Sequence, residues 1–323
     1  MKSRPALLLV VLATVLPELF SGSTPVAGFL QPGLLLFLTL GYGVAILLIR
    51  ELAVRSGTSL AGLGCLGLAY SIFNEGLLAK TLIRADHLPV ALYDDYGRCL
   101  GIMFPWAAGI GVWHACASVV FPILLVHYGF PGVQAQPWLR VRVAVGIGIV
   151  LVLLGCAVFL GRSAQAPPGA PAQLAVLLAL IAGLLVVGAR LTGGLPNESG
   201  PETTAPFLLG FSVLFPFWGL GFLAQAHPPV AVYFLALALV VALYRWCLRQ
   251  RQWLGPPAIL FFGLGWYLHN VVQALVFIGL AAHEPRRALL TGLVDAAILL
   301  GLVRWVRHRE STGFETIPAN QPG

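Results

Sequence analysis

Charged residues are scarce in this chain. Of its 323 residues, 59% are hydrophobic and only 10% are charged. A soluble domain usually has about 25% charged residues, because its surface must face water. So little charge excludes a soluble globular protein, and the high apolar content also excludes a disordered chain.

Three other patterns are absent, and each absence excludes a class of protein or site. Short segments of alternating polar and apolar residues are missing, which excludes a transmembrane β-barrel. The 19 basic residues include only two lysines, Lys2 and Lys80. The arginines are scattered instead of gathered on one face, so we expect no nucleic-acid partner. The five cysteines have no metal-ligand spacing, and three lie in apolar runs: Cys65, Cys116 and Cys156.

The chain has instead a series of apolar windows of roughly 20 residues, the length that crosses a bilayer as an α-helix. We predict an all-α polytopic transmembrane bundle of about ten helices, in contact with the lipid bilayer. Arginine and lysine are more frequent in the alternate connections that include both chain ends, so both termini are predicted to be cytoplasmic. The approximate spans are 5–21, 29–49, 58–82, 100–127, 142–161, 171–189, 206–226, 229–247, 256–281 and 287–306.

The N-terminus has the basic start and apolar run of a signal peptide. However, no A-x-A cleavage site follows, and the polar pair Pro17-Glu18 stands where the run would end, so we predict an uncleaved first helix. We assign residues 1–309 to one transmembrane domain and 310–323 to a disordered cytoplasmic tail. The preference for arginine over lysine is typical of a GC-rich bacterial genome. We therefore expect a protein integral to the bacterial cytoplasmic membrane.

A few polar side chains lie in the middle of the spans, where a charge costs about 2.5–3.5 kcal/mol and usually faces other helices. They are Asn74 and Glu75 in the third span, His114 in the fourth, His269, Asn270 and Gln273 in the ninth, and Asp295 in the tenth. Small residues share their helical faces, and small residues let helices approach closely. These are Gly64 and Gly67 in the third span, Gly111 in the fourth and Gly265 in the ninth. We predict a buried polar site formed by these three spans.

Two imidazoles and a carboxylate, with water in the open position, are a competent zinc set. In a metal-dependent hydrolase, His114 and His269 would bind zinc, and Glu75 would be the third ligand or the general base. Asn270 or Gln273 would stabilise an oxyanion. Catalytic candidates are thus Glu75, His114, His269 and Asn270, with Asn74, Gln273 and Asp295 as secondary candidates.

Two other interpretations of the same residues stay open. They could carry protons or ions in a transporter, which would favour a helix broken at Gly or Pro. They could also only hydrogen-bond helices together in a non-catalytic scaffold. The sequences Ser118–Pro122 and Ser212–Pro216 share the pattern S-V-x-F-P, in spans predicted to run in opposite directions, as an inverted repeat requires. In a chain this apolar, such a short match also arises by chance.

Polar residues at the ends of spans have simpler explanations. Glu18 lies near the outer end of its span and is expected to reach the interface. His127 lies at the cytoplasmic end of its span and is expected to be solvated. The segment Arg50–Arg55 is typical of a helix end that snorkels to the headgroups. A solvated loop explains the polar residues between the third and fourth spans better than a cation site does. These residues are Asp86, His87, Asp94 and Asp95.

Four segments carry a resemblance to known proteins: Leu16–Pro25, Ile49–Leu52, Tyr70–Leu77 and Trp113–Leu124. The region from Leu16 to Phe130 resembles a family of prokaryotic multi-pass membrane proteins that has no assigned activity. The resemblance implies a multi-pass fold and brings no mechanism with it.

Three short motifs carry a fainter resemblance. Asn74-Glu75 stands where a Glu-Glu pair would, Ile110–His114 gives x-x-x-x-H, and His269–Gln273 gives H-x-x-x-Q. The CPBP intramembrane proteases of the CAAX-processing type are similar, with Glu-Glu, F-x-x-x-H and H-x-x-x-N on separate membrane helices. The resemblance implies peptide hydrolysis within the membrane. The glutamate and the first histidine would activate water, and the second histidine would be the third catalytic group.

Overall fold

The computed structural model describes residues 3–84, 93–161, 170–194, 204–250, 256–276 and 284–311. This part of the chain contains ten helical spans that are long and apolar enough to cross a membrane. The predicted polytopic helical bundle is therefore confirmed. The only strands in the described residues are β1 (Arg98–Cys99) and β2 (Ile102–Met103), which pair in an antiparallel hairpin.

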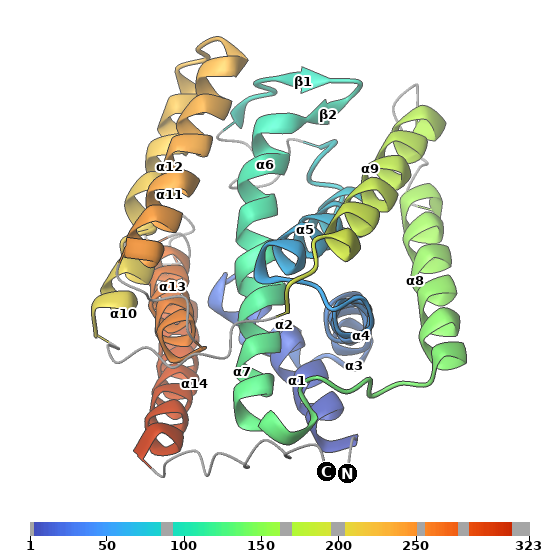
Figure 1. The fold of residues 1–323 in the computed structure, drawn as a ribbon. Coiled ribbons are helices and arrows are strands. Elements are labelled where there is room, and N and C mark those ends of the chain that lie inside the picture. The colour runs from blue at the N-terminus through green and yellow to red at the C-terminus, as the bar shows by residue number, and fades with distance from the viewer. Residues whose placement is uncertain are drawn as a thin grey trace.

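The first four spans form the densely packed part of the bundle, and the fourth runs through its middle (Figure 1). Three of these spans consist of several helical segments in series. The elements are α1 (Ser3–Phe20), α2 (Val26–Phe29), α3 (Pro32–Leu38), η1 (Thr39–Val44), α4 (Ala45–Ser56), α5 (Leu60–Ser71), η2 (Ile72–Leu78), α6 (Phe104–Trp113), η4 (His114–Val120), α7 (Phe121–Gly129) and the short η5 (Pro131–Val133).

The remaining six spans flank this centre. In Figure 1, α8 and α9 lie on one side of the fourth span, and α10 to α14 lie on the other. The elements are α8 (Val141–Gly161), α9 (Ala170–Arg190), α10 (Thr204–Phe211), α11 (Leu214–Gln225), α12 (Val230–Gln250), α13 (Pro256–Val276) and α14 (Pro285–Ser311).

Three predicted boundaries need correction. The second span continues to Ser56 instead of ending at residue 49, because the charged pair that follows is buried and does not end the helix. Helix α14 continues to Ser311, so residues 310 and 311 of the predicted tail are helical. Residues 312–323 of that tail lie outside the described part. The seventh span is interrupted at Ser212 and Val213, between α10 and α11.

The elements η1, η2 and η4 are π-helical, a geometry that is rare and frequently found at functional sites. The geometry at the end of η4 has a local cause. Pro122 has no N–H, and its ring clashes with the carbonyl of the residue four positions earlier, which is Ser118. Pro216 stands in the same relation to Ser212, where α10 ends. Both copies of the S-V-x-F-P pattern thus mark an irregular place in a helix.

Glycines allow the closest helix crossings. A Cβ at Gly67 of α5 would lie 2.6 Å from the Cα of Ala115 in η4, which confirms the predicted contact of the third and fourth spans. Gly64 is not part of this crossing, since its Cβ position has no described atom within 4 Å. Gly265 of α13 packs on α10 instead of on the third or fourth span, because its Cβ would lie 1.9 Å from the carbonyl oxygen of Phe207.

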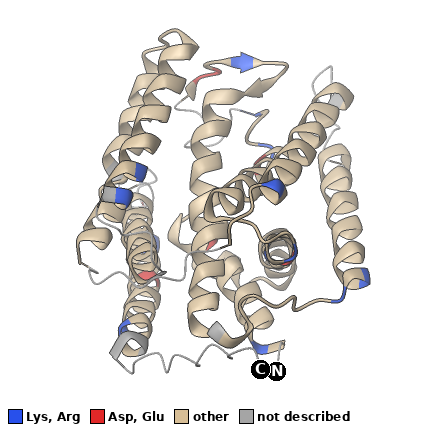
Figure 2. Ribbon diagram, viewed as in Figure 1, with Lys and Arg blue, Asp and Glu red and all other residues tan. Residues whose placement is uncertain are grey.

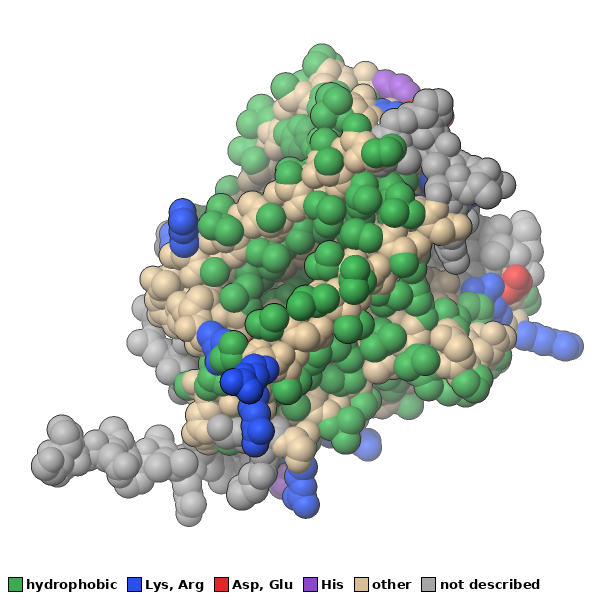
Figure 3. All heavy atoms as spheres, turned by 90° about the vertical axis from the view of Figure 1, so that its right-hand side faces the viewer, with side chains coloured by type: hydrophobic (Ala, Val, Ile, Leu, Met, Phe, Trp, Pro, Cys, Tyr) green, Lys and Arg blue, Asp and Glu red, His purple; other side chains and the backbone are tan. Residues whose placement is uncertain are grey.

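The outer spans present apolar side chains to their surroundings. Exposed leucines and valines are frequent on α8, α9 and α12. Figure 3 shows hydrophobic side chains spread across the face that contains α8 and α9, with basic groups at its margins. In Figure 2, lysine and arginine lie mainly at helix ends and in connections. This distribution is that of a bundle with lipid around its sides.

Candidate functional site

The centre of the candidate site is a hydrogen-bonded pair formed by Glu75 on η2 and His114 on η4. The Nε2 atom of His114 lies 2.8 Å from Oε1 of Glu75, and both side chains are buried. The other ring nitrogen, Nδ1, lies 2.8 Å from the hydroxyl oxygen of Ser118. Both imidazole nitrogens are therefore engaged, and the ring is held in one orientation.

Hydrogen-bonding side chains continue from this pair toward the first span. The Nδ2 atom of Asn74 lies 3.4 Å from Nε2 of His114. Tyr42, on η1, lies beside Asn74 and Glu18, and its ring centroid is 6.1 Å from that of His114. The Glu18 carboxylate accepts a hydrogen bond from the hydroxyl of Thr24, which is only half-buried. Two carboxylates thus lie in one buried polar group with an imidazole, an amide and a phenol.

A second branch leads from Glu75 toward the start of the fourth span. The hydroxyl of Thr81 donates to Oε2 of Glu75, and the indole Nε1 of Trp106 donates to the Thr81 oxygen over 3.0 Å. Thr81 is half-buried. In the predicted orientation, Thr24 and Thr81 both follow span ends on the outer side of the membrane. The polar cluster therefore approaches the outer surface at two places.

Aromatic rings enclose the imidazole of His114. The rings of Trp113, Tyr70 and Tyr42 have their centroids 4.7, 5.5 and 6.1 Å from its centroid. The Tyr70 hydroxyl is buried and has no hydrogen-bond partner among the described residues. We call the set Glu18, Tyr42, Tyr70, Asn74, Glu75 and His114 the outer cluster.

The π-helical segments explain why these residues meet. Tyr42 lies on η1, Asn74 and Glu75 lie on η2, and His114 begins η4. A π turn shifts the helical register, so each side chain points in a direction that a regular α-helix would not give it. The close crossing of α5 and η4 then brings Glu75 within reach of His114.

The order Ser118, His114, Glu75 has the connectivity of a hydrolytic triad, in which a histidine links a serine to a carboxylate. Ser118 is fully buried, however, so no substrate reaches its hydroxyl in this conformation. Ser118 also lies four residues after His114 on the same helical stretch, where such a bond forms locally. Here the serine orients the imidazole.

The ninth span contributes less to this site than predicted. The Nε2 atom of His269 lies 3.1 Å from the side-chain oxygen of Gln273 on its own helix, and its ring packs near Phe217. Asn270 reaches the edge of the outer cluster, since its Oδ1 accepts a hydrogen bond from Trp113 Nε1 over 3.1 Å. Glu75 and His114 come together as predicted, whereas His269 has other partners.

The predicted zinc set is not assembled. No group of three or more His, Cys, Asp or Glu side chains in the described residues lies in a position to hold a metal ion. The physical reason is the packing of α13, whose Gly265 face lies on α10 and not on the third span. The Glu75–His114 pair alone supplies two of the ligands that a zinc centre needs.

Asp295 lies apart on α14. It is fully buried, and neither of its carboxylate oxygens has a hydrogen-bond partner among the described residues. Its predicted place inside the bundle is therefore correct, although neither of its oxygens bonds to Glu75.

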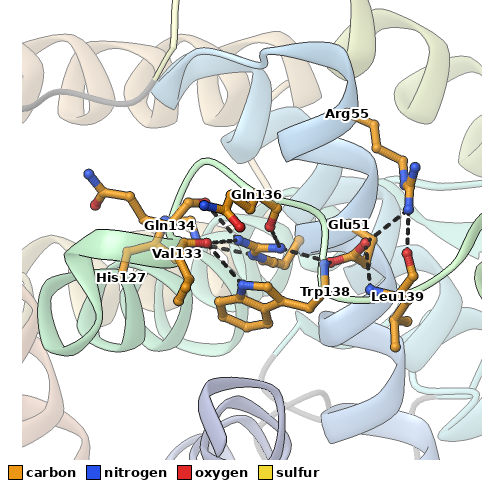
Figure 4. Close-up of polar contacts among 9 residues, drawn as sticks. Glu51, Arg55, His127, Val133, Gln134, Gln136, Trp138 and Leu139 are labelled. Atoms are coloured by element: carbon orange, nitrogen blue, oxygen red, sulfur yellow. Dashed lines mark hydrogen bonds and ion pairs between the residues drawn. The ribbon is translucent and has the colours of Figure 1, made fainter. Parts of the chain in front are cut away.

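A second polar cluster surrounds Arg50 at the other end of the second span (Figure 4). Its guanidinium lies 2.7 Å from the Glu51 carboxylate and donates to the main-chain oxygens of Val133, Gln134 and Gln136. It also donates through Nε to His127 Nε2 over 3.1 Å and lies 3.5 Å from the centroid of the Trp138 ring. We call these residues the Arg50 clamp.

The clamp corrects two expectations. Arg50 does not snorkel to the headgroups but is completely buried, and His127 is buried instead of solvated. Glu51 is equally buried and accepts hydrogen bonds from the backbone N–H groups of Trp138 and Leu139. The connection after α7 thus folds back over the ends of the second and fourth spans.

Two further predictions concern the outer side. Glu18 is buried, not interfacial, and the hydroxyl of Thr24 donates to its carboxylate. Asp94 and Asp95 are exposed, as expected of a solvated turn, and Asp95 pairs with Arg98 over 2.5 Å. Asp86 and His87 lie outside the described residues.

Sequence reasoning missed Tyr42 and Tyr70. Tyrosine is common in membrane helices, so the residue type alone does not separate these two from lipid-facing rings. One signal was available for Tyr42, because Gly41 and Gly43 flank it in mid-span and small neighbours indicate a helix contact.

The comparisons with known proteins agree with this architecture. No curated protein and no solved structure matches the chain. A family model described as an uncharacterized membrane protein family matches residues 7–318, which is nearly the whole sequence. The chain therefore belongs to this family of multi-pass integral membrane proteins.

Proposed function

We propose that the protein is a membrane transporter that moves protons and that Glu75 and His114 form its proton-binding centre. The observation that carries the proposal is the group of polar side chains Glu18, Tyr42, Asn74, His114 and Glu75, which lie together within four apolar spans. Ionisable groups in such positions are costly to insert and typically mark proton or ion pathways.

The chemistry of the outer cluster suits proton binding. A proton that arrives at Glu75 can reside on its carboxylate or on the imidazole 2.8 Å away. Glu18 is a second carboxylate with the same capacity, and Tyr42 lies beside Glu18 and Asn74. Hydroxyl groups can both donate and accept hydrogen bonds, so they can connect sites that exchange protons.

The opposite end of the same helices is closed. Arg50 follows Tyr42 by eight residues, about 12 Å along the axis. Between them Ile46 is fully buried, and Phe121 and Leu124 of the fourth span lie in the same apolar core. The Arg50 clamp then covers the helix ends. This arrangement supports a transporter conformation with its binding centre separated from the cytoplasmic side.

The helix irregularities also support transport. Transporter sites commonly lie beside interrupted helices, whose halves can move relative to each other. The fourth span contains the π-helical η4, and the seventh is interrupted between α10 and α11. A zinc hydrolase would need a third ligand near Glu75 and His114, and the described residues do not provide one.

Proton flux into proteoliposomes tests the proposal. Purified protein is reconstituted with a pH-sensitive dye inside the vesicles, and a potassium gradient with valinomycin drives protons inward. We expect wild-type protein to acidify the interior faster than vesicles without protein do. Glu75→Gln and His114→Gln should reduce the rate to that of protein-free vesicles, because the centre can no longer bind and release a proton.

A matched carboxyl variant provides the control. Asp95→Asn removes an exposed carboxylate that pairs only with Arg98 in the outer turn, so it should retain the wild-type rate. Wild-type flux no greater than the protein-free rate, or flux that survives Glu75→Gln, would show that the outer cluster does not carry protons.

A further inference from the structure

One buried carboxyl group, that of Asp295, lies outside the outer cluster. Asp295 has no exposed surface, and both of its oxygens lack a hydrogen-bond partner among the described residues. It follows Pro285, the first residue of α14, by ten positions, which is about 15 Å along the helix axis. This places the carboxyl group near the middle of an apolar span.

Most of the surroundings of Asp295 are apolar. It lies on the buried face of α14 together with Ala288, Leu299 and Val306. One buried polar side chain, Thr291, lies four residues earlier on the same helix, and it forms no hydrogen bond with Asp295. One turn earlier, a Cβ on Gly292 would lie 2.9 Å from the Leu275 side chain, so α14 and α13 are in direct contact there. An ionised carboxylate without a donor or a cation is strongly disfavoured in such a place, because nothing replaces its lost hydration.

No described side chain of the neighbouring helices compensates the charge. Helix α14 packs against α13, α1 and the end of α7. The Nε2 atom of His269 on α13 is bonded to Gln273, and its Nδ1 atom has no hydrogen-bond partner among the described residues. His127 on α7 is bonded to Arg50, and Glu18 on α1 is bonded to Thr24. None of these ionisable groups forms a hydrogen bond with Asp295.

We infer that Asp295 is a second proton-binding site, separate from the outer cluster and occupied by a proton in this conformation. The neutral carboxylic acid meets the demand for an uncharged group between α13 and α14. When α14 separates from α13 and water enters, the O–H bond of the acid breaks and the proton passes to that water. The role of this proton in transport rests on the proposed function, whereas its presence on Asp295 does not.

Isotope-edited infrared spectroscopy tests whether the proton is present. The chain has only four aspartates, Asp86, Asp94, Asp95 and Asp295, so labelling aspartate with ¹³C at the side-chain carboxyl carbon is selective. In lipid nanodiscs at pH 7.5, we expect a protonated-carboxyl band that shifts with the label. The band should disappear in Asp295→Asn and persist in Asp95→Asn, because exposed aspartates are ionised at this pH.

The cation in the buffer separates a proton from a metal ion at the same carboxyl. We expect identical spectra in sodium, potassium and choline buffers. An absent band, or a band that sodium or potassium removes, would overturn the assignment of a proton. Unchanged melting temperature in Asp295→Asn would show that loss of the band does not reflect unfolding; otherwise the conservative Asp295→Glu variant should restore a protonated-carboxyl band, one that shifts when glutamate instead of aspartate is labelled.

The flux assay separates a transported proton from a permanently bound one. Asp295→Asn keeps the shape and neutrality of the protonated acid. If the proton is bound permanently, this variant should retain wild-type flux, and that result would overturn the inferred release. Release during transport predicts flux at the protein-free level. A labelled band together with no wild-type flux would contradict the proposed function alone, and full flux without the band would contradict this inference alone.

Discussion

Replacing Arg50 by alanine is expected to lower the free energy of unfolding by about 3–5 kcal/mol, the cost of leaving one partner of a buried ion pair uncompensated. Glu51 would remain buried without its closest cation, and the main-chain carbonyls of Val133, Gln134 and Gln136 would each lose the hydrogen bond that Arg50 donates. Reversible unfolding in mixed detergent–SDS micelles measures this change. Limited proteolysis should also cut residues 130–139 faster in the variant.

Arg55 is the matched control, because it contacts the same carboxylate from the rim of the clamp. Its Nη2 atom lies 3.4 Å from Glu51, and 31% of its side chain is exposed. Arg55→Ala should therefore cost about 1 kcal/mol or less. Arg50→Lys keeps the charge but not the planar set of five donors, so it should restore only part of the stability. Equal effects of Arg50→Ala and Arg55→Ala would contradict the importance assigned to burial.

Substituting Gly265 by leucine is the second change with a large expected effect. A Cβ there would lie 1.9 Å from the Phe207 carbonyl oxygen and 2.9 Å from the Phe211 nitrogen. These are backbone atoms, so no side-chain rotation relieves the overlap and α10 must move away from α13. We expect a loss of about 3 kcal/mol, at the upper end of typical overpacking costs. The same mixed-micelle unfolding measurement applies.

Gly219 on α11 tests whether size alone explains the loss. Its Cβ position has no described atom within 4 Å, and the residue is exposed on the side of the bundle. Gly219→Leu should change the free energy of unfolding by only about 0.5 kcal/mol. Gly210→Leu should behave like Gly265→Leu, since its Cβ would lie 1.9 Å from the Phe262 carbonyl oxygen. A tolerant Gly265 would mean that the two backbones are not in contact.

Much of the outer cluster could be predicted because membranes penalise polar residues. Asn74, Glu75 and His114 are distinctive in spans that otherwise hold apolar side chains, and their burial was expected from that cost alone. His269 is equally distinctive, yet it faces Phe217 and Gln273 instead of Glu75. Local sequence indicates that a residue is buried, but it does not indicate which of several helices it meets.

The opposite error arose at the helix ends. Arg50 and His127 were expected at the headgroups because charged residues near span ends usually reach water. Arg50 contacts His127 on α7, 77 positions away, and Gln136 in the connection that folds back after α7, 86 positions away. A pattern read within one span cannot contain that information.

The sequence by itself determined the class of the protein and the number of its spans, because the length of an apolar run must match the bilayer and few charges can be buried. Tertiary structure alone decided which polar groups meet. Helix rotation depends on the π segments, on glycine crossings such as Gly67 against Ala115, and on proline at positions 122 and 216. Changing a helix register by one residue turns a side chain by about 100°, which is enough to join Glu75 to His114 or to keep them apart.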